Sequence, residues 1–92
     1  MSVIDITRHH QLSHDEAIGI AKDLAVSLSD RFDLKYDWDG DALVFHRSGV
    51  KGRLNVQPSL FHIRLELGLL LRPFKGRIEQ EIHSHLDGLI ES

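Results

Sequence analysis

The chain has 92 residues, so we expect residues 1–92 to form a single domain. Hydrophobic residues make up 41% and charged residues 27% of the sequence, and the net charge of −3 argues against a general nucleic-acid binder, which would carry a basic patch. Cysteine is absent, so disulfides are excluded. No apolar run approaches the ~20 residues of a membrane span, so we expect no transmembrane segment. The N-terminus shows no signal peptide, and we therefore expect a cytoplasmic protein.

The first two predicted elements are a strand and a helix. In residues 3–8 the apolar Ile4 and Ile6 alternate with polar side chains, which predicts a half-buried strand. Over residues 14–31 the apolar residues recur with the period of a helix, and Ser13 with Glu16 has the spacing of a capping box at the helix start. The apolar stripe of this helix contains Ala17, Ile20, Ala21, Leu24, Ala25 and Leu28.

Four more strands are predicted at residues 33–38, 42–47, 53–57 and 60–68, each with one apolar and one polar face. Asp39-Gly40 is a strong signal for a two-residue hairpin loop, residues 48–52 form the next turn, and Pro58-Ser59 form the last. The inward positions are Leu34, Tyr36, Trp38, Leu43, Phe45, Leu54, Val56, Phe61, Ile63, Leu65 and Leu67.

A final helix begins at Gly76, and its apolar positions recur at intervals of three and four residues. They are Ile78, Ile82, Leu86, Leu89 and Ile90. The element order β-α-β-β-β-β-α predicts an α+β two-layer sandwich, with a mostly antiparallel sheet and two helices on one face. We favour the strand order 1-5-4-3-2. The alternative pairs strand 1 in parallel with strand 2 through a right-handed crossover.

Catalytic and metal sites have little support in the sequence. His9, His10 and His14 cluster before the first helix, whereas His83 and His85 point about 200° apart on a helix and cannot easily share a metal. HExxH and GxSxG motifs and a phosphate-binding loop are absent. We therefore expect solvated or rim histidines, no enzyme activity, no metal and no cofactor.

Two residues are candidates for binding a small ligand. Arg47 follows Leu43 and Phe45 onto the covered face, where its guanidinium could clamp a carboxylate or, as a plainer alternative, pair with a helix acid at the rim. Trp38 continues the inward phase of its strand next to a tight turn, which favours packing and leaves ligand stacking as an alternative.

The stretch "LGLLLRPFKGRIEQEI" at 67–82 places three leucines in a row where a loop is expected. Leu69 continues the inward phase if the strand continues, and at least one leucine, foremost Leu70, must leave the inner face. Either the leucines close the bottom of the core, or they form an exposed apolar patch that binds a partner. The candidate partner-binding residues are Leu70, Leu71, Arg72, Phe74 and Lys75.

Four segments together resemble one small bacterial family. They are "EA" at 16–17, "LA" at 24–25, "YDWDGDALVFHRSGVKG" at 36–52 and "LGLLLRPFKGRIEQEI" at 67–82. The resemblance is to the polyhydroxyalkanoic acid system proteins, which are encoded in genomic regions for polyhydroxyalkanoate storage granules. It covers nearly the whole chain, and it implies a cytoplasmic accessory protein whose partner is the granule surface or a granule-coat protein.

Three other hypotheses compete with this granule-associated interaction module. The protein could carry an apolar carboxylic acid between the sheet and the C-terminal helix, with Arg47 receiving the carboxylate. It could form a homodimer through the leucines or through a sheet edge. An enzyme is the least favoured of these readings.

Overall fold

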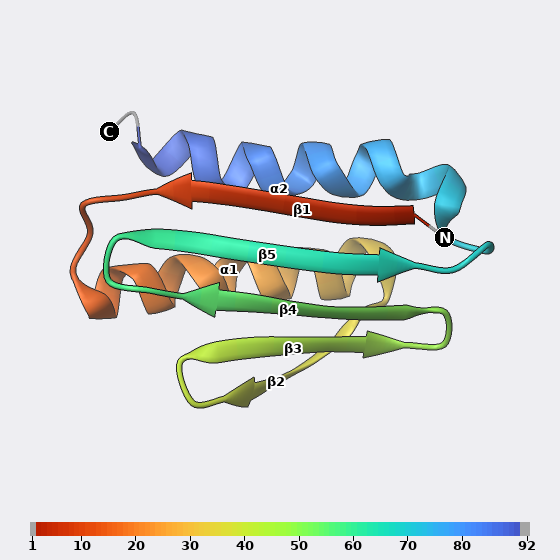
Figure 1. Ribbon diagram of the computed structural model, residues 1–92, viewed down its shortest axis with the longest axis horizontal. Coiled ribbons are helices and arrows are strands. Elements are labelled where there is room, and N and C mark those ends of the chain that lie inside the picture. Colours follow the sequence, from red (N-terminus) through yellow and green to blue (C-terminus); the bar gives the residue numbers. More distant parts are fainter. Residues whose placement is uncertain (1, 91–92) are drawn as a thin grey trace.

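The computed structural model describes residues 2–90 and, among them, the side chains of residues 2–87 (Figure 1). Five strands and two long helices follow the predicted order, and a short 3-10 helix, η1, precedes the last helix. Their bounds are β1 Ser2–His9, α1 His14–Phe32, β2 Lys35–Asp39, β3 Ala42–Arg47, β4 Val50–Val56, β5 Leu60–Leu67, η1 Arg72–Phe74 and α2 Lys75–Ile90.

The sheet has the strand order β1-β5-β4-β3-β2, and every neighbouring pair is antiparallel. The predicted order 1-5-4-3-2 is confirmed, and the parallel pairing of the first two strands is excluded. In the register, Ile4 pairs with Leu65 and Ile6 with Ile63, so the apolar sides of β1 and β5 coincide. Helix α1 carries the chain from β1 at one edge to β2 at the opposite edge (Figure 1).

Both helices lie antiparallel to each other on the same face of the sheet, as Figure 1 shows. The stripe predicted for α1 is buried in full, and Ile78, Ile82 and Leu86 of α2 are at most 1% exposed. The expectation that Leu89 and Ile90 continue this stripe falls outside the described side chains. Neither helix, over the residues described, is long and apolar enough to cross a membrane.

The first two turns of the meander differ from those that the sequence predicts. The first hairpin loop is Gly40-Asp41 rather than Asp39-Gly40, because Asp39 still pairs with Ala42 and the positive φ of 63° falls at Gly40, the first loop position. The second loop is only Ser48-Gly49, with φ of 86° at Gly49, so β4 begins at Val50. The Gly49 carbonyl oxygen accepts a hydrogen bond of 2.6 Å from the Gly68 amide, which ties this loop to the connection after β5.

Candidate docking surface

The connection between β5 and α2 is a hydrogen-bonded turn. The carbonyl oxygen of Gly68 accepts hydrogen bonds from the amides of Leu71, at 3.2 Å, and Arg72, at 3.1 Å. Leu69 and Leu70 therefore occupy the two central positions of a β-turn, where Gly, Pro, Asn and Asp are the usual residues. We refer to Leu69, Leu70 and the nearby Phe74 as the leucine lip.

The three consecutive leucines have two different environments. Leu69 is 80% and Leu70 82% exposed, whereas Leu71 is only 7% exposed and belongs to the core cluster. Leu69 does not continue the inward phase, because the strand ends at Leu67. Leu71 does not belong to the exposed patch predicted from the sequence, because the turn returns the chain to the core at this residue. Phe74 is 40% exposed and completes the lip.

Cationic side chains accompany the lip in the chain. Arg72 is exposed, and Lys75 is half-buried with its Nζ 3.9 Å from the Glu79 carboxylate. Arg77, two residues after Lys75 in helix α2, is exposed. The surface that the lip offers is therefore apolar at its tip and cationic at its base.

The two candidate ligand residues are not brought together. Arg47 ends β3, whereas Trp38 pairs with Leu43 near the start of the same strand. The Arg47 guanidinium donates a hydrogen bond of 2.8 Å to the carbonyl oxygen of Phe32, the last residue of α1. Trp38 is 41% exposed at the sheet edge. Arg47 thus caps a helix C-terminus, which is a structural role.

The space required by the carrier hypothesis is occupied by side chains of the core. Ile78, Ile82 and Leu86 form one continuous apolar cluster with sheet residues that include Ile4 and Leu65. Helix α2 packs against β1, whereas Arg47 lies on β3 beside the end of α1. The proposed carboxylate clamp is therefore not placed next to α2.

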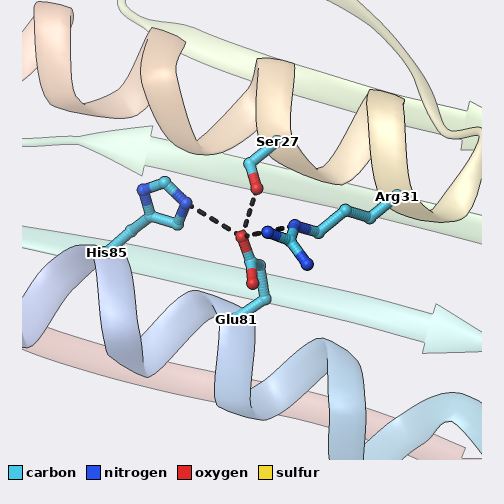
Figure 2. Close-up of polar contacts among 4 residues, drawn as sticks. All are labelled: Ser27, Arg31, Glu81 and His85. Atoms are coloured by element: carbon cyan, nitrogen blue, oxygen red, sulfur yellow. Dashed lines mark hydrogen bonds and ion pairs between the residues drawn. The ribbon is translucent and has the colours of Figure 1, made fainter.

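A polar cluster joins the two helices on their solvent side, and the sequence analysis missed it. In Figure 2, Ser27 and Arg31 of α1 and His85 of α2 all point at Glu81. The Ser27 hydroxyl donates a short hydrogen bond to Glu81 Oε2, His85 Nε2 lies 3.0 Å from the same oxygen, and Arg31 Nε lies 3.3 Å from it. The sequence does contain a sign of this cluster. Polar residues are spaced four apart beside the apolar stripe of each helix, at positions 27 and 31 in α1 and at positions 81 and 85 in α2.

The cluster holds the Glu81 carboxylate in place as an anion. The Ser27 hydrogen bond, with smaller contributions from His85 and Arg31, lowers the pKa of Glu81 against the opposing effect of burial. A serine nucleophile would need the histidine beside it as a base, but here Ser27 and His85 each contact Glu81. The arrangement cross-links α1 and α2, and it does not resemble a hydrolytic triad.

One histidine, His10, differs from the prediction that the histidines are solvated or at the rim, whereas the other six are exposed or half-buried. His10 is buried, with its ring 4.6 Å from that of Phe61, Nε2 3.0 Å from the Gln57 carbonyl oxygen and Nδ1 3.1 Å from the Leu12 amide. His10 thus fastens the β1–α1 connection to the β4–β5 turn. Within residues 2–87, no three His, Asp or Glu side chains gather in a way that could hold a metal ion.

A comparison with protein families decides the chain's affiliation. The family described as "putative polyhydroxyalkanoic acid system protein" matches residues 4–90. The chain belongs to this family. No curated protein and no solved structure matches it.

Membership in the polyhydroxyalkanoic acid system family confirms the resemblance inferred from the sequence motifs. The family's name links the chain to the polyhydroxyalkanoate system. The matched region runs from β1 to the end of α2 and so contains the leucine lip, Arg47, Trp38 and the Glu81 cluster.

Proposed function

We propose that this protein is a non-enzymatic accessory protein that associates with polyhydroxyalkanoate storage granules in the cytoplasm, and that the leucine lip is its docking element. The observation that carries the proposal is the turn after β5, which holds Leu69 and Leu70 at its two central positions with 80% and 82% exposure. The family's link to the polyhydroxyalkanoate system supports the granule as the partner.

The energetics favour an external role for these leucines. Burying one leucine side chain contributes roughly 1.5–3 kcal/mol, and folding of this chain gains almost none of it at Leu69 and Leu70. Contact with an apolar surface would recover that free energy for docking, less the cost of association. A storage granule of aliphatic polyester in water is such a surface.

The cations at the base of the lip fit the same partner. Arg72 and Lys75 follow the lip directly, and their side chains can donate hydrogen bonds to ester carbonyl oxygens or pair with acids of a granule-coat protein. They would orient the domain, while the lip would supply most of the affinity.

The Glu81 cluster supports a non-enzymatic function. Its carboxylate already accepts hydrogen bonds from Ser27 and His85 and faces Arg31, and its lowered pKa keeps it ionised at neutral pH. Such a group is a poor proton donor or acceptor at neutral pH. It is well suited to fix the two helices, and so to place the lip at the start of α2.

Granule co-sedimentation tests the proposal. Purified protein is incubated with isolated granules, with their coat proteins either left on or stripped, and the sedimenting fraction is measured. We expect wild type to sediment and Leu70→Asp not to. Val26→Asp, which changes a 38% exposed residue on α1, is the matched control and should sediment like wild type. Circular dichroism verifies that both variants are folded.

The outcomes separate the alternatives. Binding to stripped granules would identify the polymer as the partner, and binding only to coated granules would identify a component of the granule coat. Sedimentation of Leu70→Asp at the wild-type level, or no sedimentation of wild type in either sample, would refute the proposal.

A further inference from the structure

The lysines and arginines of this protein are concentrated at the end of the molecule that bears the leucine lip. Strands β3 and β5 and helix α1 end there, and β2, β4 and α2 begin there (Figure 1). Seven of the eleven basic residues lie in the segments 30–35, 46–51 and 66–77, which contain only three acidic ones. The seven are Arg31, Lys35, Arg47, Lys51, Arg72, Lys75 and Arg77.

The opposite end of the molecule has the reverse charge. It is formed by the end of β1, the start of α1, the β2–β3 loop and the last turns of α2 (Figure 1). Its acidic residues are Asp15, Glu16, Asp39, Asp41 and Asp87, and the basic residues beside them are Arg8, which pairs with Asp87, and Arg53, which pairs with Asp39. Basic residues are therefore in excess at the end with the leucine lip and acidic residues at the opposite end, although the net charge is only −3.

The cations near the lip are less neutralised than those elsewhere. On the open face of the sheet, Arg53 lies 3.0 Å from Asp39, and Arg64 lies 3.9 Å from Asp5. Among the side chains of residues 2–87, by contrast, no carboxylate lies within ion-pair distance of Lys35, Arg47, Lys51, Arg72 or Arg77.

The first turn of α2 shows that this charge works against local stability. It contains Lys75 and Arg77 and no acidic residue, although the positive end of the helix dipole favours acids at this position. Helix α1 has the favourable arrangement, with Asp15 and Glu16 in its first turn. The cations at the start of α2 are thus better explained by an external anion than by folding.

We propose that the lip end docks on an anionic phospholipid surface, with Leu69, Leu70 and Phe74 among the acyl chains and the surrounding cations at the headgroups. This inference rests on the proposed function, because it specifies the chemistry of the surface that the same lip meets. Apolar insertion combined with electrostatic attraction is the usual basis of peripheral membrane binding.

The shape of the site favours a lipid surface over an acidic protein. Leu69 and Leu70 protrude on a turn, and a protein partner would have to offer a matching pocket, whereas acyl chains adapt to the protrusion. The cations come from six elements spread around the end of the domain, so a laterally continuous layer of negative charge can meet them together.

Vesicle flotation tests this proposal. Purified full-length protein is mixed with vesicles of phosphatidylcholine alone or with about a third phosphatidylglycerol, and the bound fraction is measured at low and high salt. We expect binding to the anionic vesicles only, with weaker binding at high salt because the Debye length falls from about 8 Å at 0.15 M to 3 Å at 1 M.

Two double variants separate the contributions. Arg72→Gln/Arg77→Gln should weaken binding by about fivefold for each cation removed. Leu69→Ser/Leu70→Ser should abolish it. The matched controls are Lys22→Gln and Val26→Ser, which change an exposed cation and an exposed apolar residue in the middle of α1 and should bind like wild type.

Four results would overturn the inference. They are equal binding to both vesicle types, no binding to either type, no effect of salt on binding, and unchanged binding of the Arg72→Gln/Arg77→Gln variant. Binding to immobilised polyglutamate but to no vesicle would assign the cationic end to an acidic protein instead. Granule sedimentation that depends on Leu70 without any vesicle binding would preserve the proposed function and reject only the lipid surface.

Discussion

Gly52 shows how closely the sheet is packed at a single residue. It lies on the covered face of β4, paired with Phe45 on one side and Leu65 on the other. A Cβ atom at this position would overlap Cδ2 of Leu65 and lie 3.0 Å from the Arg64 carbonyl oxygen. The glycine is therefore required by close packing, since its φ is not in the left-handed region.

We expect Gly52→Ala to lower the free energy of unfolding by about 1–3 kcal/mol, because the added methyl group overpacks the core. Gly19→Ala is the control, since a Cβ there meets no atom within 4 Å, and alanine should stabilise α1 by up to ~1 kcal/mol. Urea denaturation of both variants measures the difference. Wild-type stability of Gly52→Ala would contradict this packing.

Glu81 makes the stability of the helix pair depend on pH. Its pKa is lowered, chiefly by the Ser27 hydrogen bond, so its contribution is present above the pKa of an unfolded glutamate and is lost as the pH falls through the lower folded pKa. We expect Glu81→Gln to reduce the free energy of unfolding by about 1–2 kcal/mol at pH 7.

The difference between wild type and Glu81→Gln should shrink as the pH falls from the pKa of an unfolded glutamate, about 4.3, through the lower pKa of folded Glu81, because the wild-type carboxyl becomes protonated over this range. Chemical denaturation at pH 7 and pH 3 provides the comparison. An equal difference at both pH values would mean that the charge of Glu81 does not stabilise the helix pair.

At the scale of one element, the connection from β5 to α2 divides its leucines between two roles. Leu71 fills the core, and Leu69 and Leu70 remain in solvent. We expect Leu71→Ala to cost about 2–5 kcal/mol of folding free energy. Leu70→Ala should change stability by no more than about 0.5 kcal/mol. Thermal or urea unfolding of the two variants tests this division, which would be incorrect if Leu70→Ala were as destabilised as Leu71→Ala.

At the scale of the whole molecule, alternation in the sequence was sufficient to predict the sheet. Ile4 and Ile6 in the first strand match the alternation of the last strand, and the structure pairs them with Leu65 and Ile63. One apolar face per strand and two amphipathic helices leave few arrangements other than a two-layer sandwich. These local patterns were therefore enough to predict the fold class, but they left two strand arrangements open, of which the structure has the favoured order 1-5-4-3-2.

The parts that sequence reasoning missed depend on how distant elements face one another. Glu81 meets Ser27 only because of the rotation and offset of α2 against α1, which no local pattern specifies. Arg8 follows Ile4 and Ile6 onto the covered face and reaches Asp87 at 3.2 Å, which depends on where α2 ends. The burial of Leu71 depends on the tight turn at Gly68, which the leucine run itself does not reveal.

The absence of cysteine permits a direct test of whether the leucine lip touches the granule. A single cysteine introduced as Leu70→Cys, or as Val26→Cys for comparison, is labelled with an environment-sensitive fluorophore. The emission is then recorded while granules are added. Docking through the lip predicts a blue shift for the label at position 70 and none at position 26. A shift at position 26 alone, or at neither position, would contradict the claim that the leucine lip is the docking element.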